Sequence, residues 1–162
     1  MTYLVWLSQT GFAVWGRESD SIWAYPTILF LHTLGLSLLV GFATAIDFRI
    51  LGFSTGLPLD SLRRFFRVVW TGFWINALSG SMLLIMTPAK LANPTFIVKL
   101  VCIGLGVLTT IGIRREVFGA APRADAGGGV STLGRIFAVA SLVLWTAAIV
   151  AGRLTAYIGN VR

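Results

Sequence analysis

The only histidine of the chain lies inside a long apolar segment and is the first residue to consider for chemistry. His32 stands between Tyr25-Pro26 on one side and Asp47-x-Arg49 on the other, in an almost entirely apolar run. About 20 such residues in helical conformation cross the hydrocarbon core of a bilayer. An ionisable side chain within such a span costs free energy unless it has a partner or a function. His32 is therefore the leading candidate for a ligand-binding residue.

Other side chains that could bind a ligand are expected in the same half of the membrane on other spans. At a rise of about 1.5 Å per helical residue, His32 falls about 12–15 Å below the outer surface, Lys99 and Arg153 fall about 5 Å below it, and Met82 falls in the same half. Asn76 falls near the middle of its span. The predicted cofactor-binding set is therefore His32, Asn76, Met82, Lys99 and Arg153, with His32 as the candidate metal ligand.

A haem b or a quinone is one interpretation of this set. His32 would be an axial ligand or a hydrogen-bond partner, and Lys99 and Arg153 would meet propionates or a polar head group. Haem iron is commonly held by histidine, sometimes with methionine opposite, which makes Met82 a candidate second ligand. Membrane haems of the b type usually have two histidines, and this chain has one.

Copper is a second interpretation, because imidazole, thioether and thiolate ligands suit Cu(I). Met82, Met86 and Cys102 would supply the sulfur ligands beside His32. No compact ligand motif accompanies these residues. A small transporter for copper or for an anion is the corresponding function.

A purely structural role is the third interpretation. His32 would hydrogen-bond Asn76, Ser79 or a backbone carbonyl across the bundle, as polar side chains commonly do between membrane helices. Lys99 and Arg153 would extend outward to lipid phosphates. The protein would then be a scaffold subunit without a cofactor.

The composition places these residues in a membrane protein. Of the 162 residues, 56% are hydrophobic and only 12% are charged, about half the charged share of a soluble domain. The formal charge of +7 comes from basic residues at the ends of apolar segments, where anionic lipids account for them, so no nucleic-acid partner is expected. The single cysteine excludes an intrachain disulfide.

No catalytic constellation is present in the sequence. A second histidine, a CxxC motif and a phosphate-binding loop are all lacking, and the six acidic residues lie in loops or at helix ends. The sequence therefore predicts that the protein is not an enzyme.

The elements that position the candidate residues are all predicted to be helices. The expected fold is all-α, a transmembrane four-helix bundle forming one integral membrane domain over residues 1–162. An N-terminal interfacial amphipathic helix within residues 1–20 carries Trp6 and Trp15, and no removable signal peptide is expected. The four spans are expected at about residues 22–46, 68–86, 95–113 and 133–157.

Local signals refine this arrangement. A ridge of small residues at Ser37, Gly41 and Ala45 predicts close approach of another helix to the first span. Asn93 is expected to cap the third span, and Pro94 to begin it. The connector between the second and third spans is short, which predicts that these spans are antiparallel neighbours. Asp47 with Arg49 is interpreted as a charged pair at the membrane boundary.

Basic residues are unevenly divided between the two ends of the expected spans. The end that carries both termini holds Arg17, Lys90, Lys99, Arg153 and Arg162. The other end holds Arg49, Arg63, Arg64, Arg67, Arg114, Arg115, Arg123 and Arg135. Because the more basic side usually faces the cytoplasm, both termini are expected on the outer, periplasmic side.

Six short motifs are distributed along the chain. They are Trp23-x-Tyr25-Pro26, His32-x-x-Gly35, Asp47-x-Arg49-x-Leu51-Gly52, Trp70-x-Gly72-Phe73, Asn93-Pro94-x-Phe96-x-x-Lys99 and Gly152-Arg153-Leu-x-Ala156-Tyr157. The combined pattern resembles an uncharacterised bacterial domain-of-unknown-function family of small four-span inner-membrane proteins. The resemblance covers nearly the whole chain. It implies a multi-pass protein of the bacterial inner membrane and supplies no activity.

The sequence thus predicts a non-catalytic membrane subunit that binds a redox cofactor or a quinone-like or lipid ligand around His32. Its expected partners are the lipid bilayer and either further copies of the chain or other subunits of a larger membrane complex. The scaffold and transporter interpretations remain as alternatives.

Overall fold

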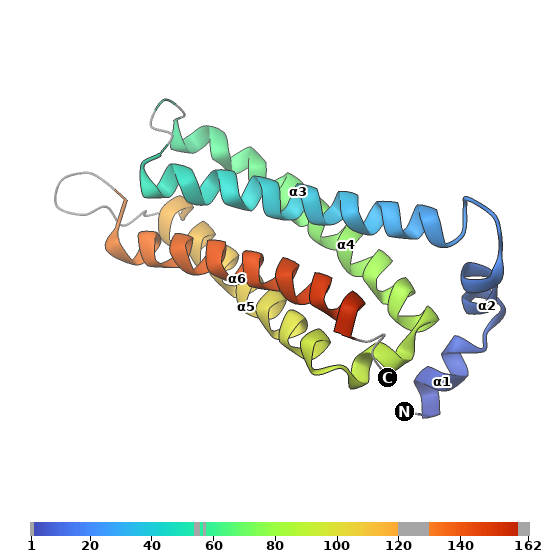
Figure 1. The fold of residues 1–162 in the computed structure, drawn as a ribbon. Coiled ribbons are helices and arrows are strands. Elements are labelled where there is room, and N and C mark those ends of the chain that lie inside the picture. The colour runs from blue at the N-terminus through green and yellow to red at the C-terminus, as the bar shows by residue number, and fades with distance from the viewer. Residues whose placement is uncertain (1, 54–55, 57, 120–129, 159–162) are drawn as a thin grey trace.

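Four long helices dominate the computed structural model, which describes residues 2–53, 56, 58–119 and 130–158 (Figure 1). They are α3 (Tyr25–Leu51), α4 (Phe65–Met86), α5 (Pro94–Phe118) and α6 (Thr132–Ile158). Each is long and apolar enough to cross a bilayer. The predicted all-α, four-helix transmembrane bundle is therefore confirmed, and the chain is a multi-pass membrane protein.

The C-terminal end of α3 shows why this helix ends later than its predicted span. Gly52 adopts φ 94°, the left-handed conformation that ends a helix at low cost with glycine. The Gly52 N–H donates to the carbonyl of Arg49, and the Phe53 N–H donates to that of Phe48. The Phe48 and Phe53 rings meet edge-on with centroids 5.8 Å apart. This capping motif places the end of α3 at Leu51, five residues later than the sequence predicted.

Short 3₁₀ helices flank α4. The first, η1 (Leu59–Arg64), leads directly into α4, and the second, η2 (Pro88–Ala92), connects α4 to α5. The predicted cap of α5 is confirmed, since the side-chain oxygen Oδ1 of Asn93 accepts a hydrogen bond of 2.9 Å from the Thr95 N–H. The predicted loop after α5 falls largely on residues 120–129, which lie outside the described residues.

The bundle consists of two helical hairpins. α3 packs mainly against α4, α5 packs mainly against α6, and the contact of α3 with α6 joins the two pairs. α4 and α5 run antiparallel and line a common cavity, as expected for neighbouring helices, and the Phe66 and Phe118 rings meet between them. Their backbones approach each other less closely than the backbones within either hairpin do. We call the region between them the α4–α5 seam.

The closest helix contact lies at Gly35 of α3 and Gly72 of α4. A Cβ atom added to Gly35 would lie 2.6 Å from the Asn76 backbone nitrogen, and one added to Gly72 would lie 2.6 Å from that of Leu39. Such contacts are possible only with glycine on both helices.

The prediction that another helix approaches the first span closely at its ridge of small residues is wrong. Ser37, Gly41 and Ala45 are all exposed, and no atom lies within 4 Å of a Cβ added to Gly41. α3 is apolar on every side, so its sequence does not reveal which face carries the contact.

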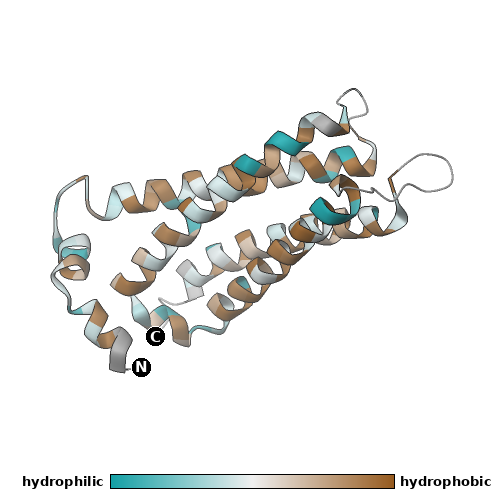
Figure 2. Ribbon diagram, turned by 180° about the vertical axis from the view of Figure 1, so that it is seen from behind, coloured by the Kyte–Doolittle hydropathy of each residue, from teal (hydrophilic) through white to brown (hydrophobic). Residues whose placement is uncertain are grey.

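α5 and α6 meet through aromatic rings that lie over glycines. A Cβ on Gly106 would lie 3.0 Å from the Trp145 ring, and one on Gly112 would lie 3.1 Å from the Phe137 ring. Trp145 is 1% exposed and belongs to the apolar core, which α3, α4, α5 and α6 all contribute to. Large apolar side chains also cover the outside of the long helices, as expected for a surface in lipid (Figure 2).

The N-terminal segment forms two short helices rather than the single interfacial helix expected. They are α1 (Thr2–Ser8) and α2 (Gly11–Glu18), and the side chains of Ser8 and Thr10 hydrogen-bond carbonyls three residues earlier at the break. Trp6 and Trp15 are exposed, as an interfacial segment requires.

This segment packs against the end of α4. Gly16 lies directly against the Met86 side chain, which is 2% exposed. The Arg17 guanidinium donates to the Met86 carbonyl at 3.2 Å. α1 and α2 therefore cover the end of the bundle at which α3 begins (Figure 1).

Candidate functional site: a cationic pocket around His32

A cavity of about 340 Å³ lies between the four long helices at the end that α2 covers. We call it the His32 pocket, and its polar lining consists chiefly of His32, Thr33, Asn76, Lys90, Lys99 and Arg153. None of the residues that line it is acidic. Its size lies at the small end of the range for ligand sites.

The pocket brings together most of the predicted site. His32 comes from α3, Asn76 from α4, Lys99 from α5 and Arg153 from α6, and all four line the same cavity. Depth along each span predicted that His32, Lys99 and Arg153 share one half of the bundle and that Asn76 lies near its middle. The structure adds that they face a common space.

Reciprocal hydrogen bonds with α4 fix the His32 ring. Its Nδ1 lies 3.1 Å from the Asn76 backbone carbonyl and 3.2 Å from the Ser79 hydroxyl. In return, the Asn76 side-chain amide donates to the His32 carbonyl at 2.8 Å. Because a carbonyl only accepts, the contact with Asn76 requires a proton on Nδ1 of the neutral ring. The Nε2 atom then carries the free lone pair, with no hydrogen-bond partner among the described residues.

Gly80 makes room for this ring orientation. A Cβ at Gly80 would lie 3.0 Å from the His32 Cε1 atom and 3.3 Å from its Nδ1 atom. Asn76, Ser79 and Gly80 therefore form one face of α4 that holds the imidazole. Through Nδ1, His32 makes the interhelical contact that the structural interpretation expects. Its Nε2 atom takes no part in that contact.

Lys99 crosses the pocket along α6. Its Cδ, Cε and Nζ atoms lie 3.4–3.7 Å from the position of a Cβ on Gly152, so the absence of a side chain there admits the lysine stem. The Nζ atom lies 6.0 Å from the centre of the Phe96 ring. Among the described residues no carboxylate pairs with Lys99. Arg153 and Lys90 are more exposed and stand at the rim.

The sulfur-containing candidates lie elsewhere. Met82 is 39% exposed and does not line the His32 pocket, and neither does the half-buried Cys102. Met86 packs against Gly16 instead. Within the described ranges, no three His, Cys, Asp or Glu side chains gather closely enough to hold a metal ion. The copper ligand set proposed from the sequence is therefore not assembled.

Two contributors to this region were not recognised from the sequence as site residues. Lys90 lies in η2 and reaches the pocket because that connector folds over its mouth. Trp145 forms part of the pocket wall while its ring packs on Gly106. Trp145 precedes Gly152 by two helical turns, so the two residues lie on the same face of α6. This spacing could have indicated that Trp145 lies on the pocket side.

Asp47 is not the boundary residue that the sequence suggested. It lies one turn inside α3, is 1% exposed, and neither carboxylate oxygen has a hydrogen-bond partner in the described structure. The Ser141 side chain of α6 faces it without reaching hydrogen-bonding geometry. The core of the bundle therefore contains a polar group whose burial is uncompensated.

The chain matches no protein-family model, no curated protein and no solved structure. The candidate site is thus defined by its own geometry.

Proposed function

We propose that this protein is a non-catalytic membrane subunit that binds a quinone-like ligand in the His32 pocket. The observation that carries the proposal is the combination of a free Nε2 lone pair with cationic side chains and no acid in one cavity. A phenolic hydroxyl can donate to His32 Nε2, while Lys99 donates to a ligand oxygen or balances its negative charge. The apolar walls suit a ring and the start of a hydrocarbon tail.

The seam between α4 and α5 supports a ligand that arrives from the bilayer. The backbones of these helices do not pack closely, and residues of both line the pocket on that side. A hydrophobic ligand could place its tail in this seam and its head against His32. The uneven distribution of arginine supports an orientation with both termini on the periplasmic side of a bacterial inner membrane. Assembly into a homo-oligomer or a larger complex is part of the proposal.

A haem b is the second candidate, because an imidazole with a free Nε2 can ligate iron and the cations can meet propionates. Met82 does not face the pocket, so the opposite ligand would come from outside the described lining. A visible absorption spectrum of the purified protein, recorded before and after dithionite, separates the two candidates. A Soret band that shifts on reduction and is absent in His32→Ala supports haem.

The quinone proposal predicts weaker binding after loss of either polar partner. A hydrogen bond to a charged group contributes about 1.5–3 kcal/mol, so Lys99→Gln is expected to raise the Kd of a short-chain benzoquinol about 10- to 100-fold. His32→Gln is expected to weaken binding as well. Isothermal titration calorimetry in detergent measures both effects.

Arg135→Gln is the matched control, because it also removes one cation but from an exposed position on α6 outside the pocket. If all three variants bind like the original protein, or if none of the proteins binds, the quinone proposal fails. If the purified protein is also colourless, the haem candidate fails too, and the scaffold interpretation replaces both.

A further inference from the structure

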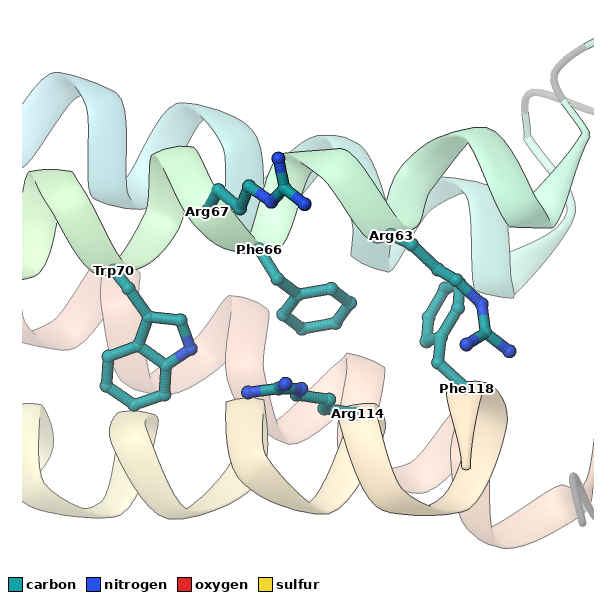
Figure 3. A pocket seen from close by; sticks show the side chains of 6 residues that line it. All are labelled: Arg63, Phe66, Arg67, Trp70, Arg114 and Phe118. Carbon is teal, nitrogen blue, oxygen red and sulfur yellow. The ribbon is translucent and has the colours of Figure 1, made fainter. Parts of the chain in front are cut away.

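A second cavity, of about 260 Å³, lies in the α4–α5 seam at the end opposite the His32 pocket (Figure 3). We call it the arginine cleft. Its lining consists of Arg63, Phe66, Arg67, Trp70, Arg114 and Phe118. Three of these six side chains are cationic, three are aromatic and none is acidic. The cleft is therefore suited to an anion that also has an apolar part.

The aromatic rings at the floor of the cleft pack against one another and against Phe73. Phe66 and Phe118 are 5% and 7% exposed, and their rings meet edge-on with centroids 5.3 Å apart. Trp70 is held in the same way by Phe73, with centroids 5.7 Å apart. The Trp70 Nε1–H is buried and has no hydrogen-bond partner in the described structure. A buried donor of this kind normally has a partner, so a ligand oxygen would satisfy it.

The three arginines come from η1, α4 and α5. In Figure 3, the Arg114 side chain runs along α5 beneath the Phe66 ring with its guanidinium toward Trp70. Arg67 lies along α4, and the Arg63 side chain lies beside Phe118. The side chains of Arg67 and Arg114 make no hydrogen bond or ion pair with any described residue. Guanidinium groups present several N–H donors in a plane, which matches the oxygens of a phosphate.

The position of the cleft favours a phospholipid over free phosphate as the ligand. It lies near one end of two helices that cross the bilayer, where lipid head groups are found. A free phosphate would use the arginines but gain little from three aromatic rings. A phospholipid would use both, since its glycerol and first methylene groups contact the rings.

We infer that the arginine cleft binds the phosphate of an anionic phospholipid, with the acyl chains along the α4–α5 seam. The inference does not depend on the proposed function of the His32 pocket. The phosphate diester accepts hydrogen bonds from Arg67, Arg114 and the Trp70 Nε1–H, and the lipid fills part of the space that the two hairpins leave between them.

The test uses delipidated full-length protein in a neutral detergent. Phosphatidylglycerol, phosphatidylcholine and inorganic phosphate are added separately, and bound lipid is counted by native mass spectrometry while thermal stability is followed in parallel. Phosphatidylglycerol is expected to bind and raise the unfolding temperature, and the other two to have much smaller effects. Equal binding of phosphatidylcholine would overturn selectivity for an anion, and an equal effect of inorganic phosphate would overturn the lipid as its source.

Three variants locate the binding. Arg114→Gln and Trp70→Phe are each expected to weaken phosphatidylglycerol binding, the former about tenfold or more. Trp70→Phe retains an aromatic ring, so it keeps the test valid if Arg114→Gln folds poorly. Arg135→Gln removes an exposed cation outside the cleft and is expected to bind as the original protein does. Equal losses in all three variants, or no loss in either cleft variant, would overturn the assignment.

Discussion

Replacing Gly35 by alanine is expected to destabilise the bundle by about 3 kcal/mol, the upper part of the usual range for overpacking. The new Cβ would meet the Asn76 backbone nitrogen at 2.6 Å and the Gly72 carbonyl oxygen at 2.9 Å. Backbone atoms cannot rotate away as a side chain can, so α3 and α4 must separate. The same separation would disturb the His32–Asn76 hydrogen bonds one turn away. Thermal unfolding in detergent measures the effect.

Gly41→Ala is the matched control on the same helix. Gly41 is exposed, and a Cβ there meets no atom within 4 Å. Alanine is the better helix former, so this change is expected to be neutral or to stabilise by up to about 1 kcal/mol. Equal unfolding temperatures for the two variants would show that α3 and α4 do not approach at Gly35.

Asp47→Val is expected to stabilise the protein by about 1–3 kcal/mol, the cost usually attached to an unsatisfied buried polar group. Asp47 is buried against α6, and its oxygens have no partner in the described structure. Valine supplies a similar branched shape without polar atoms, so it removes the cost of desolvation. The measurement is again the unfolding temperature at neutral pH.

Asp20→Val controls for the general loss of a negative charge, since Asp20 is exposed in the segment before α3. Little change is expected there. A strong loss of stability in Asp47→Val would contradict the account and would mean that the carboxyl group has a stabilising partner, with the Ser141 hydroxyl facing it as the first candidate.

The sequence was sufficient for the architecture because bilayer thickness dictates the length of each apolar segment. It also predicted that His32, Lys99 and Arg153 share one half of the bundle and that Asn76 lies near the middle, since depth follows from position along a span. The sequence did not predict how each helix is rotated about its axis, that is, which face it turns toward its neighbours. α3 is apolar all round, and the spacing of its small residues predicted the close contact at Gly41, whereas the structure has it at Gly35, against Gly72.

The same limit explains Met82 and Asp47. Met82 shares the depth of His32 but lies on another face of α4, and depth alone cannot separate faces. Asp47 looked like a boundary residue because charged side chains usually mark span ends. The capping motif at Gly52 extends α3 by a further turn and moves Asp47 into the core.

The division into two hairpins has a consequence for how the protein is made. α3 finds its principal partner in α4, which is synthesised next, and α5 finds its partner in α6. Each pair can therefore associate as soon as it leaves the translocon, and the contact between α3 and α6 must wait for the finished chain. Two separately expressed fragments, divided within η2, are accordingly expected to assemble when co-expressed, as co-purification would show. Division between α3 and α4 would split the tightest contact and is expected to be far less well tolerated.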